Sequence, residues 1–130
     1  MPTKVDFIVA DRTCKFSGGN LVSLSSYQDK TVLKEIVQSL NSLDPSVTQV
    51  WIGGYNFLDY GKWKWTDGTN FKVDVPESPG FNCISFDFKE ETLRPTECFH
   101  IHAFVCARKS SNDTSSTAGT ARYFKAILQF

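Results

Sequence analysis

Four cysteines, Cys14, Cys83, Cys98 and Cys106, are the residues of this 130-residue chain whose type and number could support covalent chemistry. No two of them form a CxxC pair, so their spacing does not indicate a zinc ribbon or a redox motif. An even number of cysteines without metal-ligand spacing is typical of disulfides, which form in an oxidising compartment. The alternative that the spacing leaves open is a set of buried free thiols in a cytosolic protein.

His100 and His102 are the chain's 2 histidines. They stand two positions apart, so on a strand both side chains would point to the same face and could chelate zinc. Two ligands do not make a site, and no third stands at a suggestive spacing, which favours ordinary surface or edge histidines. The chain also lacks GxSxG, HExxH, P-loop and dinucleotide-binding motifs. We therefore expect no enzymatic activity and no metal site.

The composition indicates one globular domain, with 41% hydrophobic and 22% charged residues. The 14 basic and 14 acidic residues balance, so no net field attracts nucleic acid or an anionic membrane. No run of about 18 apolar residues is present to span a membrane. Residues 1–6 lack the apolar core of a signal peptide, so either the protein is cytosolic or its true start lies upstream of Met1.

The elements that position these residues are predicted to be helices followed by strands. Residues 7–10 lead into Cys14 as the end of a short helix, and apolar residues over 32–40 recur at helical spacing. Short strands are expected at 21–24, 50–52, 61–65, 81–88 and 99–107, with a polar connection over 89–97. This order predicts an α+β domain over residues 1–109. Residues 110–130 are predicted to form a Ser/Thr-rich, flexible tail that contains the glycosylation sequon Asn112-Asp113-Thr114.

Five ordered segments resemble the C-type lectin-like domain. They are Gly18-Gly19-Asn20-Leu21-Val22-Ser23-Leu24, Trp51-Ile52-Gly53-Gly54, Trp63-Lys64-Trp65-Thr66-Asp67-Gly68, Phe104-Val105-Cys106, and the pair Cys83 and Cys98. The amino-acid sequence of the first two segments is most similar to that of the soluble, single-domain ladderlectin and antifreeze members. The resemblance implies two helices and antiparallel strands with a long loop, and it places the three tryptophans in the core.

The resemblance also implies the disulfide pairing, Cys14 with Cys106 and Cys83 with Cys98. Members of the family begin with a strand that pairs with the carboxy-terminal strand, and that opening strand is missing here. Its loss would leave residues 99–107 with an unpaired edge, so we expect a truncated start. The alternative is that Tyr123–Gln129 folds back to occupy this edge.

Calcium binding is not expected. In sugar-binding members calcium sits in the long loop, and the corresponding loop here, residues 70–82, is shortened and lacks the usual ligand triplet. Where the family has Trp-Asn-Asp, this chain has Leu93, Arg94 and Pro95, so a cation and a proline replace two oxygen ligands. A rearranged calcium site remains conceivable from the nearby acidic residues Asp74, Glu77, Asp87, Glu90, Glu91 and Glu97.

The function that the resemblance implies is that of a secreted binding protein for a glycan or glycoconjugate, acting without a cofactor. The predicted ligand-binding residues are Asp74, Glu77, Asn82, Arg94 and Glu97, which would hydrogen-bond hydroxyls or pair with charged groups. The alternative is a module that binds a protein or an ice surface through flat apolar surface. That surface would come from Phe71, Val73, Val75 and Phe81. A decayed copy that does not fold is a third possibility.

Overall fold

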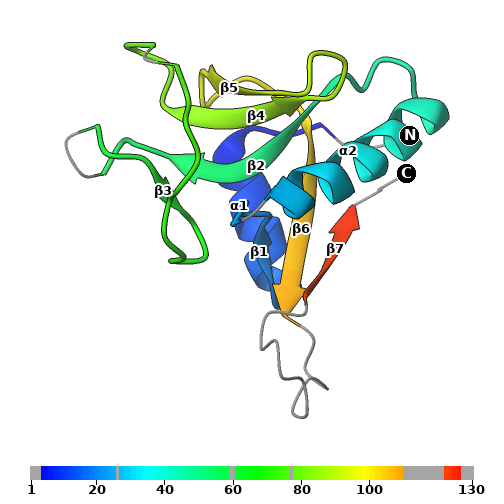
Figure 1. Cartoon of the computed structure of the whole chain (residues 1–130), viewed down its shortest axis with the longest axis horizontal. Helices are drawn as coiled ribbons and strands as arrows, with labels where there is room; N and C mark the ends of the chain where they lie inside the picture. Colours follow the sequence, from blue (N-terminus) through cyan, green and yellow to red (C-terminus); the bar gives the residue numbers. More distant parts are fainter. Residues whose placement is uncertain (1–3, 26, 59–60, 77, 110–121, 127–130) are drawn as a thin grey trace.

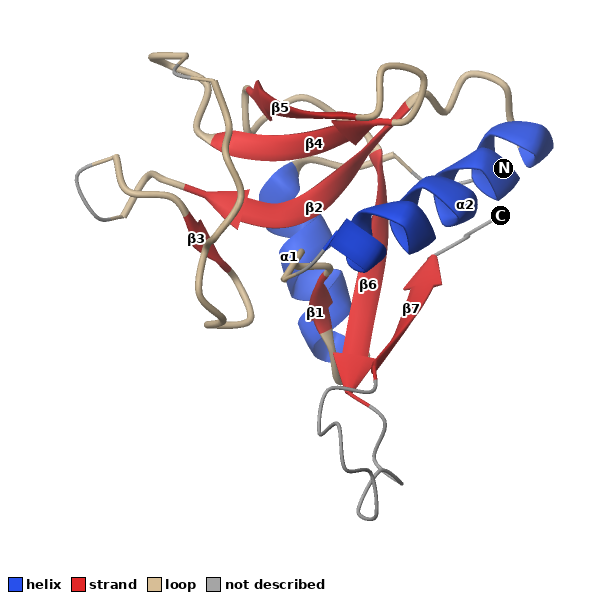
Figure 2. Ribbon diagram, in the orientation of Figure 1, coloured by secondary structure: helices blue, strands red, loops and turns tan. Residues whose placement is uncertain are grey.

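The computed structural model describes residues 4–25, 27–58, 61–76, 78–109 and 122–126 (Figure 1). Helix α1 spans Phe7–Phe16. The Asp6 carboxylate accepts a hydrogen bond from the Val9 N–H at 2.9 Å and so caps the start of α1. The buried residues Phe7, Ala10 and Cys14 recur at helical spacing. This buried stripe lies against β1, β2 and β6 (Figure 2).

Helix α2 spans Tyr27–Leu43. Ser25, just before the helix, donates from its backbone N–H and from its hydroxyl to the Asp29 carboxylate in the first turn, both at 2.8 Å. Leu33, Val37 and Leu40 are buried and share one face, as their spacing predicted. None of the helices described here is long and apolar enough to cross a membrane.

The described strands form one mixed sheet. They are β1 (Asn20–Leu21), β2 (Gln49–Tyr55), β3 (Lys64–Trp65), β4 (Cys83–Asp87), β5 (Thr92–Thr96), β6 (Ala103–Lys109) and β7 (Arg122–Ala126). Central strand β2 runs antiparallel to β3 and β4 and parallel to β6. The sheet is therefore mixed: its strand pairs are antiparallel, as expected, except for the parallel pair β2 and β6. Parallel neighbours need a long crossover, and β3, β4 and β5 lie between these two strands in the chain.

Strand β5 lies where the sequence analysis expected only a polar connection. Its five residues pair with the whole of β4, from Cys83 opposite Thr96 to Asp87 opposite Thr92. Because β5 is an edge strand among the described residues, it tolerates a proline and exposed polar side chains. Because of these residues, β5 lacks the alternating apolar positions from which a strand is predicted.

Strand β7 corrects the expectation of a flexible tail over residues 110–130 at the part that the structure describes, residues 122–126. Residues 122–126 pair antiparallel with residues 105–109 of β6, which is the fold-back that was named as the alternative. At the other end of the same strand, Val5 forms a two-way backbone bridge with His102 at 3.0 and 2.9 Å. The edge that was expected to be unpaired is thus occupied. Residues 110–121, with the sequon, and 127–130 lie outside the described residues.

Two hydrophobic clusters lie on opposite faces of the sheet. Because successive strand residues point to opposite faces, Val50 and Ile52 of β2 belong to one cluster and Trp51 to the other. The larger cluster includes the buried face of α2, and the smaller includes that of α1. Trp51 and Trp65 are fully buried, which confirms their predicted place in the core, and Trp63 packs partly buried against it.

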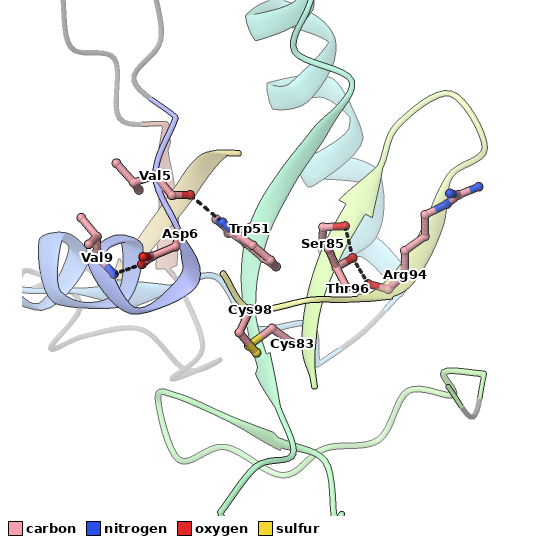
Figure 3. Close-up of a disulfide and its surroundings, with 9 residues drawn as sticks. All are labelled: Val5, Asp6, Val9, Trp51, Cys83, Ser85, Arg94, Thr96 and Cys98. Carbon is pink, nitrogen blue, oxygen red and sulfur yellow. Dashed lines mark hydrogen bonds between the residues drawn. A yellow bond between two sulfur atoms is a disulfide. The ribbon is translucent and has the colours of Figure 1, made fainter. Parts of the chain in front are cut away.

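Both predicted disulfides are present. Cys14 and Cys106 join α1 to β6, and Cys83 and Cys98 join the start of β4 to the segment after β5. Figure 3 shows the second disulfide close to Trp51, whose indole N–H donates to the Val5 carbonyl oxygen at 2.8 Å. The amino-terminal residues, the centre of the sheet and the base of the long loop are therefore tied together. The described residues contain no free cysteine.

The two glycines of the Trp51-Ile52-Gly53-Gly54 segment are required by close approach. A Cβ on Gly53 would lie 2.9 Å from the backbone oxygen of Leu21, and a Cβ on Gly54 would lie 2.4 Å from the Cδ1 atom of Ile84. Both distances are shorter than real Cβ contacts. A side chain at either position would push β2 away from its neighbours.

Candidate ligand-binding groove

In the structure the long loop is the whole connection from β3 to β4, residues 66–82, and its described part is drawn in shades of green in Figure 1. Aromatic stacking holds its first half on the core. The ring of Phe71 stacks on Trp65 with centroids 4.6 Å apart and on Trp63 at 6.1 Å. Such contacts stabilise the packing beyond the area that they bury.

Asp67 fixes the start of the loop. One carboxylate oxygen accepts hydrogen bonds from the backbone N–H and the hydroxyl of Thr69, at 2.9 and 2.6 Å. The other oxygen accepts from the hydroxyl of the fully buried Ser23. The loop is thereby joined to the segment that leads into α2.

Side chains of the loop alternate between the core and solvent. Phe71, Val73 and Val75 are partly buried and pack against the larger cluster, whereas Lys72 and Asp74 point outward and are exposed. The expectation of a flat apolar surface from Phe71, Val73, Val75 and Phe81 is therefore wrong for the first three residues. Phe81 is 38% exposed.

A groove of about 500 Å³ opens between the start of α2, the long loop and the turn that joins β4 to β5. Its lining combines charged, hydroxyl and apolar side chains: Leu24, Ser25, Lys30, Lys72, Val73, Asp74, Pro76, Glu91, Thr92 and Leu93. A second hollow of about 420 Å³ is lined by Ser25, Gly68, Thr69, Asn70 and Lys72. Because Ser25 and Lys72 line both, the two hollows adjoin. We call the pair the α2–loop groove.

The charges of the α2–loop groove differ in their pairing. Glu91 forms an ion pair with Lys34 of α2, with Nζ and Oε2 2.8 Å apart. Lys30, Lys72 and Asp74 have no ion-pair partner within the part of the chain that the structure describes. These three side chains are thus available to a ligand.

The four predicted ligand-binding residues that the structure describes do not lie together. Asp74 lines the α2–loop groove, whereas Asn82 lines a separate hollow of about 290 Å³ beside Trp63. Arg94 lies on β5, where its Nε atom is 3.5 Å from an Asp87 oxygen. The Oε2 atom of Glu97 lies 3.4 Å from the Nε2 atom of His100. Glu77 lies outside the described residues.

Lys30 and Lys72 are charged residues of the groove that the sequence analysis did not predict as ligand-binding. The alternation of Phe71, Val73 and Val75 in the long loop was a usable signal for Lys72, because it places the intervening side chains outward. No local pattern indicated Lys30, since its place beside the loop depends on how α2 packs.

Comparison with known families decides the class of this domain. The model of the family described as "Lectin C-type domain" matches residues 3–108. The chain belongs to the C-type lectin domain family. This confirms the resemblance on which the predicted fold and disulfide pairing depended.

Relatives of this C-type lectin domain include proteins with different named activities. The galactose-specific lectin nattectin of Thalassophryne nattereri is 26% identical over 80% of this chain and 68% of its own length. The type-2 ice-structuring protein of Brachyopsis segaliensis is 28% identical over 82% of this chain and 62% of its own length. The crystal structure of a calcium-independent type II antifreeze protein superposes with a TM-score of 0.66 and 27% identity, over 81% of this chain and 79% of that one. The chain therefore spans about two thirds of the curated relatives that it matches.

Asp87, one of the acidic residues near the long loop, already has hydrogen-bond and ion-pair partners. One oxygen of Asp87 accepts from the backbone N–H groups of Lys89 and Glu90 at 3.0 and 3.1 Å, and the other faces Arg94. No three His, Cys, Asp or Glu side chains among the described residues are placed to hold a metal ion. The described side chains therefore do not supply the shell of about six to eight oxygen ligands that calcium prefers.

His102 is a half-buried residue that packs on the core. Its ring meets Trp51 edge to face with centroids 5.0 Å apart, and its Nε2 atom has no hydrogen-bond partner among the described residues. Burial lowers the pKa of His102 below its ordinary value of 6.5, and the positive charges of His100 and Lys4 add to this effect. His100 lies outside on the same surface, 6.4 Å away between ring centroids.

Proposed function

We propose that this C-type lectin domain is a secreted module that binds a glycan through the α2–loop groove without calcium. One observation carries this proposal. The groove presents hydroxyl, ammonium and carboxylate groups next to apolar side chains, and three of its charged groups have no partner among the described residues. A site of this kind suits a sugar, which offers hydroxyls around an apolar ring face.

The relatives support both halves of the proposal. One is named as a galactose-specific lectin, and the crystal structure of another is titled as calcium-independent. Arg94 lies on β5, and its guanidinium faces the carboxylate of Asp87 on β4. This cation supports the absence of a calcium site, because it would repel the metal ion. The two disulfides support secretion, since such bonds persist in oxidising compartments.

A glycan array probed once with calcium and once with a chelator tests the proposal. We expect the same hits under both conditions. A matched pair of variants then locates the site: Asp74→Asn in the groove should weaken the hits, and Glu35→Gln on the exposed face of α2 should not. Hits abolished by the chelator would contradict calcium-free binding. Equal loss in both variants would contradict the location.

A second candidate is recognition of ice, because a relative over most of this chain is an ice-structuring protein. Thermal hysteresis of a concentrated solution distinguishes the two. Thermal hysteresis together with no binding to any glycan on the array would favour ice recognition over glycan binding.

A further inference from the structure

We propose that the α2–loop groove takes an acidic oligosaccharide, with Lys30 and Lys72 pairing with its carboxylate or sulfate groups. This proposal deepens the function above and rests on it. It names the class of glycan and adds two residues that contact it.

The shape of the α2–loop groove favours a chain of sugars over a single one. Its two hollows, of about 500 and 420 Å³, share Ser25 and Lys72 and run from the turn at Gly68 to the β4–β5 turn at Thr92. Each hollow alone falls within the roughly 300–1,000 Å³ of ordinary ligand sites. A linear ligand can therefore occupy both by passing Lys72.

The charge of the α2–loop groove favours an anion. Among the residues that the structure describes, the charged side chains of the lining are those of Lys30, Lys72, Asp74 and Glu91, and the ion pair with Lys34 neutralises Glu91. Two ammonium groups and one carboxylate then remain, in a chain whose formal net charge is +0. In the second hollow, Lys72 is the charged residue of the lining.

The remaining polar groups of the lining suit sugar hydroxyls. Ser25 and Thr69 each donate their hydroxyl hydrogen within the protein, to Asp29 and Asp67, at 2.8 and 2.6 Å. Their oxygens are therefore oriented to accept from a ligand hydroxyl. Asp74 accepts as well, whereas the lysines donate. None of the described side chains in the lining is an aromatic ring on which a nucleobase could stack, which favours a saccharide over a single-stranded nucleic acid.

Titration calorimetry with defined oligosaccharides tests the inference. The probes are a heparin-derived hexasaccharide, a hexamer of galacturonic acid and neutral maltohexaose. We expect an acidic hexamer to bind at least about tenfold more tightly than the neutral one, and to weaken as salt rises from about 0.05 to 0.3 M. Lys30→Gln and Lys72→Gln should each weaken acidic binding by about threefold to tenfold.

Lys62→Gln is the matched control, because Lys62 is an exposed loop lysine outside the lining of both hollows. It should change the affinity by less than about twofold. Equal weakening by Lys62→Gln, or equally tight binding of a single-stranded oligonucleotide of the same charge, would show a general attraction to anions and overturn the inference. Neutral glycans bound in the groove, dependent on Asp74 and indifferent to both lysine variants, would overturn it while leaving the proposed function standing.

Discussion

Removing the two disulfides separately should destabilise the protein by different amounts, because the loops that they close differ greatly in length. The cysteines of one bond are 92 positions apart and those of the other are 15 apart. Chain-entropy arguments give about 4.5 kcal/mol for the longer loop and about 3 kcal/mol for the shorter. The shorter loop is nested in the longer one, and this changes the larger figure by only about 0.2 kcal/mol.

Packing costs should differ less than these entropies. Cys14, Cys83 and Cys106 are buried and Cys98 is partly buried against the same cluster, so replacement by alanine removes sulfur contacts from the smaller cluster in both variants. The predicted difference of about 1.5 kcal/mol in the free energy of unfolding should therefore persist.

Guanidinium unfolding followed by tryptophan fluorescence measures the difference. The variants are Cys14→Ala with Cys106→Ala, and Cys83→Ala with Cys98→Ala. The wild-type protein serves as the reference. An alkylating reagent added without a reductant should modify none of its cysteines, since they are bonded as disulfides. A cost for the inner pair equal to or above that for the outer pair, at equal m-values, would refute the loop-length reasoning.

Three further predictions concern the core, the loop and pH. Gly53→Ala should lower the free energy of unfolding by about 1–3 kcal/mol, because the new Cβ meets a backbone oxygen that cannot move alone; chemical denaturation measures this, and an unchanged midpoint would contradict it. Phe71→Ala should lower the free energy of unfolding by about 2 kcal/mol and weaken glycan binding, because the stacking that holds the long loop is lost. A chelator should leave the melting temperature of the wild-type protein unchanged. The lowered pKa of His102 means that the unfolded chain binds more protons, so stability should be full above pH 6.5 and fall below it; His102→Gln should remove this slope. The pKa of Asp44 is lowered from 3.8 by hydrogen bonds from Ser46, so a second loss should follow below that pH, and denaturation at stepped pH tests both.

The features that could be predicted from sequence are those with local or motif signals. The helical spacing of Leu33, Val37 and Leu40 is a property of a continuous segment, so it indicated α2 and its buried face directly. The paired disulfides and the buried Trp51 and Trp65 came from the family resemblance. Composition alone had left free thiols open as an alternative.

The features that could not be predicted depend on which segments meet in space. Strand β5 lacks an alternating apolar pattern, and only its pairing with β4 defines it. Strand β7 is reached across residues 110–121, so its partner could be named only as an alternative. The α2–loop groove joins Lys30 to Lys72 across 42 positions of sequence, which no spacing rule covers.

The structure also indicates how the long loop can keep its shape without an ion. Phe71 stacks on Trp63 and Trp65, and the Asp67 carboxylate accepts hydrogen bonds from Thr69 and Ser23. Aromatic packing and a hydrogen-bonded turn thus supply fixed contacts at one end of the loop. The ammonium group of Lys72, which this loop presents outward, needs no metal to hold the acidic glycan that we propose.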